Sequence, residues 1–307
     1  MVTDTPTPTP PPAGLGLDAG GTRTRWALGG ADGALIAQGQ AAGWSGLQLD
    51  STEGRAQIAA TLGEIARASG PVRAVVAGVT GFDATQGPAF CALAASAFGV
   101  APAAVRAFSD IELACHAAFA PGEGYVVYAG TGSVAAFIDA QGALHRAGGR
   151  GVVIDDAGGG HWIARQALRQ IWRAEDEAPG AWQASPLARR VFEQIGGSDW
   201  AATRRWAYGA SRGELGTLAL AVAAAAEDDP AALALLHEAG RELARLGAAL
   251  THRFGPRPLA LAGRVFELHP AIEQNLRAAL PAGSELRRSR LPAHHTAARL
   301  AAQRTTP

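Results

Sequence analysis

Two short segments of the sequence combine glycine with hydroxyl residues in a way that suits phosphate groups. The first contains Asp-Ala-Gly-Gly-Thr and the second Gly-Thr-Gly-Ser. Glycine lets backbone N–H groups approach phosphate oxygens, and a hydroxyl adds a further donor. The aspartate could also hold hydrated Mg²⁺, which prefers oxygen ligands. The candidate residues are Asp18, Gly20, Gly21 and Thr22 in the first segment and Thr131, Gly132 and Ser133 in the second.

Asp110 is a candidate general base. It follows the apolar run Val105 to Phe108 and precedes a segment with helical patterning, so we expect it to cap that helix. A hydroxyl that attacks a phosphoryl group must lose its proton, and a carboxylate at a helix start can accept it. A purely structural N-cap aspartate has the same pattern, and the two roles are compatible.

The composition excludes several classes of protein. All 27 basic residues are arginine, whereas P-loop kinases, protein kinases and Schiff-base enzymes need a lysine. The formal net charge is zero, which argues against nucleic acid or an anionic membrane as the main partner. The longest apolar segments, such as residues 215–226, are shorter than the ~20 residues of a membrane span. We therefore expect a cytoplasmic protein with a small-molecule substrate.

The elements that would position these residues occur twice along the chain. Three short apolar runs joined by glycine-rich turns begin near Gly14, and three more begin near Gly124. Each set precedes further helices and strands, and helices dominate residues 160–251. The duplication indicates an α/β protein with two lobes, mixed sheets flanked by helices, and a nucleotide cleft between the lobes.

Expected boundaries follow from the same patterns. Residues 1–13, rich in threonine and proline, read as a disordered tail. We assign residues 14–120 with 291–307 to an N-terminal lobe and residues 121–290 to a C-terminal lobe. Strands are expected over 14–17, 26–28, 34–37, 72–79, 105–108, 125–129, 133–138, 143–145, 259–262 and 285–286. Helices are expected over 51–68, 87–98, 110–119, 266–280 and 292–303.

Three segments carry a resemblance to a known family. They are Asp18-Ala-Gly-Gly-Thr-Arg-Thr-Arg-Trp26, Tyr128-Ala-Gly-Thr-Gly-Ser133 and Gly158-Gly-Gly-His-Trp-Ile-Ala-Arg-Gln-Ala-Leu168. They resemble segments of the N-acetylglucosamine kinases and of the wider BadF/BadG/BcrA/BcrD-type ATPase family, within the actin-like (ribonuclease H-like) superfamily. The resemblance implies two actin-like lobes, ATP and Mg²⁺ as cofactors, and phosphorylation of an amino sugar, N-acetylglucosamine or glucosamine, at O6.

The resemblance also implies roles for individual residues. Asp110 falls where the family has its catalytic base, and Asp18 falls where it serves Mg²⁺ and phosphate. The second hairpin would contact the other face of the phosphates, and Gly263 would lie close to adenosine. The residues at sugar-contact positions are Trp44, Thr80, Gly81, Asp110 and Asp156.

The sequence departs from the family pattern in two places. Where the family has Gly-Asp-Glu-Gly, this chain has Asp155, Asp156 and Ala157 before the glycine, so either aspartate can bind the sugar, and the register favours Asp156. Arg264 replaces the second glycine of a Gly-Gly pair. It can stack on the base or pair with a phosphate, which leaves the nucleotide preference open.

Two other functions fit the same family. One is an ATPase that activates a radical enzyme, but such relatives hold an iron–sulfur cluster with cysteines, and this chain has only Cys91 and Cys115. The other is a regulatory nucleotide-binding protein, although too few residues precede Leu15 for a helix-turn-helix module. We expect a homodimer, for which the helices between residues 214 and 251 offer a surface. No motif reads the sugar's 2-substituent, so N-acetylmuramic acid and hexoses remain open as acceptors.

Overall fold

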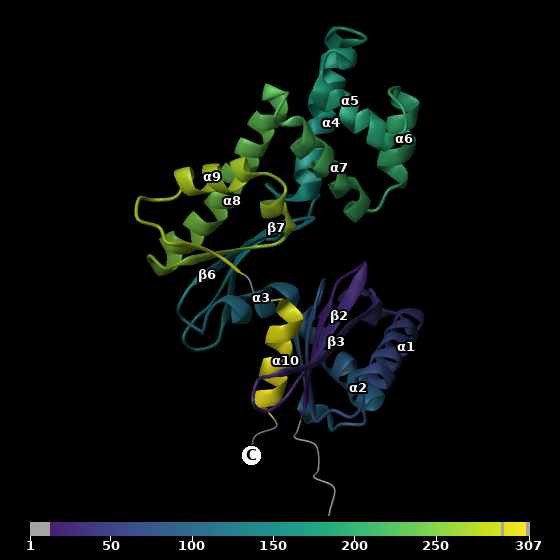
Figure 1. Ribbon diagram of the computed structural model, residues 1–307, viewed down its shortest axis with the longest axis vertical. Coiled ribbons are helices and arrows are strands. Elements are labelled where there is room, and N and C mark those ends of the chain that lie inside the picture. Colours follow the sequence, from purple (N-terminus) through teal and green to yellow (C-terminus); the bar gives the residue numbers. More distant parts are fainter. Residues whose placement is uncertain (1–12, 290–291, 305–307) are drawn as a thin grey trace, which may run out of the picture. The chain divides into compact units, whose positions relative to one another are not determined.

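The computed structural model describes residues 13–289 and 292–304. These residues form two compact units (Figure 1). Unit 1 consists of residues 13–117 and 292–304, and unit 2 of Ala118–Ser289. The division falls at the end of α3, whereas the sequence suggested a boundary after residue 120. The expected disordered tail lies outside the described residues, except for Ala13.

Unit 1 contains a five-stranded mixed sheet with the order β3-β2-β1-β4-β5. β1, β4 and β5 run parallel, and β2 is antiparallel to both of its neighbours. Parallel strands need crossover connections, which the helices supply. The strands are β1 (Gly14–Ala19), β2 (Arg23–Gly29), β3 (Leu35–Ala42), β4 (Ala74–Val79) and β5 (Val105–Ser109).

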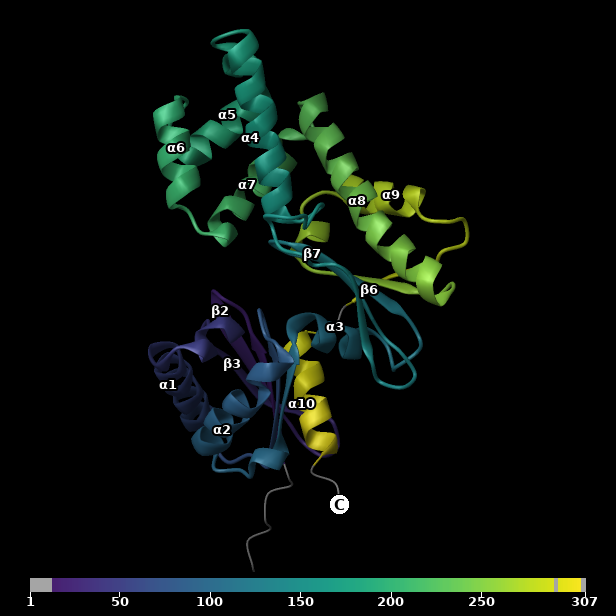
Figure 2. The same cartoon turned by 180° about the vertical axis from the view of Figure 1, so that it is seen from behind.

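Helices cover both faces of this sheet (Figures 1 and 2). Alternate residues of β1 point to opposite faces, so Leu15 and Leu17 pack with one pair of helices while Gly16 and Asp18 face the other pair. A Cβ atom on Gly16 would lie 2.1 Å from a backbone nitrogen of α10, which explains the glycine. The first pair is α1 (Thr52–Ser69) and α2 (Gly87–Phe98), and the second is α3 (Asp110–Ala118) and α10 (Ala293–Gln303).

Unit 2 repeats the topology of unit 1. Its sheet has the order β10-β9-β6-β7-β8. Read from the meander, this order is β8-β7-β6-β9-β10, which matches β3-β2-β1-β4-β5 of unit 1. β6, β9 and β10 run parallel, and β6, β7 and β8 form the antiparallel meander. The predicted duplication is therefore confirmed. The strands are β6 (Tyr125–Ala129), β7 (Ser133–Ile138), β8 (Leu144–Gly148), β9 (Leu259–Ala262) and β10 (Leu286–Arg288).

The helices of unit 2 form two groups (Figure 2). α8 and α9 lie side by side, with α8 packed over β6, β7 and β8. The remaining four helices pack with one another, chiefly α4 on α7 and α5 on α7. The helices are α4 (Gly160–Glu177), α5 (Pro186–Ile195), α6 (Trp200–Gly209), α7 (Arg212–Ala225), α8 (Pro230–Phe254) and α9 (Pro270–Ala279).

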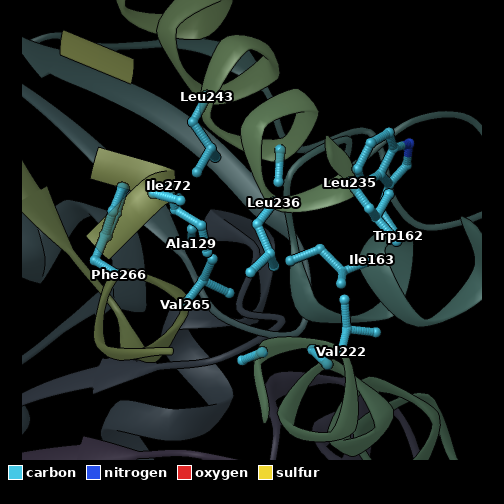
Figure 3. Packing of buried hydrophobic residues seen from close by; sticks show 14 of the residues in the cluster. Ala129, Trp162, Ile163, Val222, Leu235, Leu236, Leu243, Val265, Phe266 and Ile272 are labelled. Carbon is cyan, nitrogen blue, oxygen red and sulfur yellow. The ribbon is translucent and has the colours of Figure 1, made fainter. Parts of the chain in front are cut away.

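The core of unit 2 joins its sheet to both groups of helices (Figure 3). Val265 and Phe266 enter it from η5, a 3₁₀ helix over Arg264–Glu267. The single helix expected over 266–280 is wrong, because the chain forms η5 first and then α9. Pro270 starts α9 at a position where its missing N–H is not needed, and the His269 ring caps the helix by accepting from Ala271 N–H.

In the described part of the chain, no helix is long and apolar enough to cross a membrane.

Candidate functional site

The predicted site residues of unit 1 follow the carboxyl ends of its three parallel strands. Asp18 lies next to the end of β1, Thr80 and Gly81 follow β4, and Asp110 follows β5. Open α/β sheets bind their ligands at this edge, because the loops there surround a shared space. The topology thus brings to one edge of the sheet four residues that span more than ninety positions of the sequence, from Asp18 to Asp110.

Asp18 and Asp110 interact electrostatically. Burial raises the pKa of the Asp18 carboxyl, and the negative charge of Asp110 raises that pKa further. Arg25, which lies opposite Asp18 in the β1–β2 ladder, lowers it. Two neighbouring carboxylates beside one guanidinium can divide two tasks: one can bind a hydrated divalent cation while the other accepts a proton.

Asp110 occupies the first turn of α3, and Ser109 makes the N-cap contact. The Ser109 hydroxyl accepts from the N–H of Glu112, three residues ahead, at 3.4 Å. One carboxylate oxygen of Asp110 accepts from the N–H of Ile111 at 2.8 Å. The expectation that Asp110 itself caps the helix is therefore corrected by one residue. Asp110 is nevertheless the first residue of α3.

The first hairpin is tied to neighbouring loops by backbone hydrogen bonds. The N–H of Trp44 donates to the carbonyl of Gly20 at 3.1 Å, and the N–H of Thr80 donates to the carbonyl of Ala19 at 2.9 Å. The N–H of Gly46 donates to the carbonyl of Thr80 at 2.9 Å. The tip of the hairpin, Gly21 and Thr22, remains exposed to solvent. The structure thus holds the hairpin in place and leaves its tip accessible.

The side chain of Trp44 belongs to the core of unit 1. It is only 1 % exposed, and its ring stacks on Phe90 with the centroids 5.5 Å apart. Its indole nitrogen has no hydrogen-bond partner among the described residues. The backbone of Trp44 lies at the hairpin, but a sugar contact by its ring stays a prediction.

The second hairpin is clamped to the start of α4. The N–H groups of Gly160 and His161 donate to the carbonyls of Gly130 and Thr131 at 2.8 and 3.0 Å. The buried Ser133 hydroxyl donates to the carbonyl of Ala157 at 2.7 Å. The proton of Ser133 is thus engaged within the protein, and backbone N–H groups and the Thr131 hydroxyl are left as the donors suited to a phosphate.

The two adjacent aspartates point to different parts of unit 2. One oxygen of Asp156 accepts from the N–H of Gly151 at 3.0 Å, and a Cβ atom on Gly132 would lie 2.3 Å from the other. Asp156 therefore lies directly against the hairpin, held by a left-handed backbone with φ of 56°. Burial raises its pKa. Asp155 instead pairs with Arg245 of α8 at 3.1 Å.

The backbone conformation and packing at Gly263 require a glycine at this position. Its φ of 98° is a left-handed value that suits glycine, and a Cβ atom there would lie 2.2 Å from the carbonyl oxygen of Ala129. The end of β9 can therefore approach the end of β6 closely. This contact places η5 directly beside the second hairpin.

A pocket of about 490 Å³ lies next to this hairpin, within unit 2. Its walls come from α7 and η5, and they are mostly small or apolar with a few polar groups, as is usual for sites of small ligands. No sequence motif marks this pocket, although small residues recur on α7 every three to four positions, which indicates one open helix face. The lining residues are Gly130, Thr131, Gly160, Gly213, Gly216, Thr217, Ala219, Leu220, Ala223, Ala224, Arg264, Val265, Glu267 and Leu268.

Comparison with known proteins identifies the relatives of the chain. The profile of the BadF/BadG/BcrA/BcrD ATPase family matches residues 15–282. No curated protein matches the sequence at a significant level. A crystal structure from Chromobacterium violaceum, provisionally described as an N-acetylglucosamine kinase, shares 27 % identity with a TM-score of 0.73, over 95 % of this chain and 99 % of that one.

Two more distant structures share the fold. One, from Porphyromonas gingivalis, is also provisionally described as an N-acetylglucosamine kinase; it is 17 % identical with a TM-score of 0.65, over 92 % of this chain and 96 % of that one. The other is a ROK family glucokinase from Streptomyces griseus in complex with glucose and AMPPNP. It is 17 % identical with a TM-score of 0.59, over 95 % of this chain and 98 % of that one. The two-lobed actin-like fold of sugar kinases is thereby shown.

Proposed function

The chain belongs to the BadF/BadG/BcrA/BcrD ATPase family, and from this premise we propose that it transfers the γ-phosphoryl group of ATP to O6 of an amino sugar. The observation that carries the proposal is the pair of interacting carboxylates, Asp18 and Asp110, at the carboxyl edge of the unit 1 sheet. Transfer to a sugar hydroxyl needs a base for the hydroxyl proton as well as a group for the metal, and this pair provides one of each.

Asp110 acts as the base in this proposal. Its carboxylate accepts the proton of the sugar hydroxyl as the oxygen attacks the γ-phosphorus. The bond between that phosphorus and the β–γ bridging oxygen then breaks, and ADP leaves with the electron pair. The products are a sugar phosphate and ADP, and the proton on Asp110 returns to solvent.

Asp18 fits a Mg²⁺ ion carried by the nucleotide. Mg²⁺ keeps several water ligands and takes one or two carboxylates together with phosphate oxygens. When bound, Mg²⁺ offsets the charge on the phosphates, and the exposed tip at Gly21 and Thr22 supplies donors to them.

Unit 2 would hold the nucleotide. Thr131 and Gly132 offer the phosphates a hydroxyl and backbone amides, while the adjoining pocket has an apolar wall for the base and ribose. Gly263 brings η5 to the edge of this pocket. The general base Asp110 belongs to unit 1, whereas these phosphate donors belong to unit 2.

The amino-sugar acceptor is the finer part of the proposal. The relative at 27 % identity, which matches almost the full length of both chains, supports it. A carboxylate can accept from two neighbouring hydroxyls of a pyranose, and Asp156 is the buried carboxylate beside the second hairpin. We assign Asp156 to the sugar hydroxyls, and the loop residues Thr80 and Gly81, with Trp44, to the same substrate. The homodimer and the cytoplasmic location stay predictions.

An acceptor panel tests the function. ADP production would be measured with N-acetylglucosamine, glucosamine, N-acetylmuramic acid, glucose and no sugar, at equal ATP and Mg²⁺. We expect the highest kcat/KM with N-acetylglucosamine or glucosamine and little ADP without sugar. Comparable ADP production with and without sugar would instead identify an ATPase activator and would overturn the kinase.

A further inference from the structure

η5 is a rigid short helix at the edge of the unit 2 pocket. Val265 and Phe266, its two central residues, are each 3 % exposed and point into the core, where Figure 3 shows them near Ala129 and Ile272. Gly263 fixes the start of η5 through its contact with Ala129. The backbone of η5 therefore has little freedom to move independently of the sheet.

The first and last residues of η5 carry opposite charges on the same face. In a 3₁₀ helix, side chains three positions apart lie almost directly above each other. Arg264 and Glu267 have this spacing, both are exposed, and both line the pocket. Within residues 13–289 and 292–304, neither side chain forms a hydrogen bond or an ion pair, with the other or with any third residue. The pocket thus presents an uncommitted donor group and an uncommitted acceptor group.

The two groups lie at different distances from the second hairpin. Arg264 directly follows Gly263, which touches Ala129 at the base of the hairpin. Glu267 lies one 3₁₀ turn further along η5, a rise of about 6 Å. The opposite wall runs in the same direction. A Cβ atom added to Gly216 would lie 3.7 Å from the Thr131 methyl group, so this part of α7 lies beside the hairpin, and Ala223 and Ala224 follow two turns later on α7. A nucleotide with its phosphates at the hairpin would meet Arg264 first and Glu267 second.

We propose that Arg264 donates to the α-phosphate of the bound nucleotide and that Glu267 accepts from the ribose hydroxyls. This inference rests on the proposed function, and it names the residues by which the nucleotide site recognises its ligand. The guanidinium matches phosphate oxygens with two parallel N–H donors, and this chain has no lysine to supply such a contact. A carboxylate with no other partner suits the vicinal hydroxyls of ribose, which are both donors.

Nucleotide binding without sugar tests each assignment separately. Affinities for ADP, AMP, adenosine and 2′,3′-dideoxy-ADP would be measured by competition against a fluorescent ATP analogue. For Arg264→Gln we expect AMP and ADP to bind roughly 10- to 100-fold more weakly, with adenosine unchanged. For Glu267→Gln we expect ADP and adenosine to bind roughly 5- to 30-fold more weakly, with the affinity of the dideoxy nucleotide unchanged.

Matched variants on α8 control for a general change of charge. Arg241→Gln and Glu238→Gln remove exposed charges of unit 2 outside the pocket, and all affinities should equal those of the wild type. The inference is overturned if Arg264→Gln weakens adenosine as much as AMP, which would indicate stacking on the base, or if Glu267→Gln weakens the dideoxy nucleotide as much as ADP. A wild-type protein that binds no nucleotide would overturn the proposed function as well.

Discussion

The two units share one strand order and one hairpin position, but different chemical groups surround their hairpins. In unit 1 the strand that leads into the hairpin carries Asp18, and the loop after β4 carries Thr80. In unit 2 the corresponding positions, by strand register, carry Tyr128 and Arg264. Unit 1 places the carboxylates Asp18 and Asp110 near each other, whereas unit 2 combines backbone donors, an apolar pocket and single charged groups. A duplicated scaffold can thus assign proton and metal chemistry to one copy and nucleotide recognition to the other.

Removal of the general base Asp110 should have the largest effect, and it should affect only the proton transfer that we assign to unit 1. For Asp110→Asn we expect kcat to drop by ~10²–10⁴-fold, because general-base catalysis contributes about that much. Nucleotide affinity should stay unchanged, because Asp110 neither lines the pocket nor is assigned to the phosphates or the metal. Steady-state kinetics and nucleotide binding would be compared with Asp32→Asn, a change in the exposed β2–β3 turn. Near-normal turnover in a folded Asp110→Asn protein would contradict the assignment.

The neighbouring aspartates of unit 2 should differ in their effect on the sugar. For Asp156→Asn we expect the sugar KM to rise by roughly 10- to 100-fold, since a charged acceptor is lost from a buried position. Asparagine tolerates the left-handed φ and keeps an acceptor for Gly151, so the loop should remain folded. Asp155→Asn, which removes only the half-exposed pair with Arg245, is the control and should leave KM nearly unchanged. If Asp155→Asn raised the sugar KM more than Asp156→Asn, the match of this loop to the family pattern would be off by one residue.

The hairpins themselves should respond differently to an added methyl group. For Gly132→Ala we expect a loss of about 1–3 kcal/mol in the free energy of unfolding, because the new Cβ would lie 2.3 Å from Asp156. Gly21→Ala meets no atom within 4 Å and should cost about 1 kcal/mol or less. Urea unfolding of both variants without ligand makes the comparison. Equal losses would mean that the second hairpin is not held against Asp156.

The duplicated sheets were predictable because hairpin punctuation and strand spacing repeat locally in the sequence. The role of Gly14 and Gly16 was not, since it depends on the backbone of α10, almost three hundred residues away. The exact helix starts were also not predictable, because they depend on single residues. Ser109 caps α3 in place of Asp110, and Pro270 begins a second helical segment after η5. The pocket was not predictable from the sequence, because its two walls, α7 and η5, become neighbours only in the folded unit.

The smallest expected effect concerns His294 of α10, a helix of unit 1. His294 is buried, and burial, with His295 and Arg25 nearby, lowers its pKa to about 4. Its pKa in the unfolded chain is higher, so the unfolded state binds more protons between about pH 6.5 and 4, and stability falls as the pH decreases through this range. We expect the wild type to lose about 1–2 kcal/mol more than His294→Asn between pH 7 and 5. Urea unfolding at both pH values measures this difference, and an identical loss in the two proteins would exclude a neutral buried His294.

The most direct test of the central claim is to identify the product. The protein would be incubated with ATP, Mg²⁺ and N-acetylglucosamine, or the best acceptor of the panel, and the reaction followed by ³¹P NMR. We predict one sugar phosphomonoester at O6 for every ADP formed, with no accumulation of orthophosphate, and neither product at a comparable rate with Asp110→Asn. Orthophosphate that appears in step with ADP, without a sugar phosphate, would contradict the account.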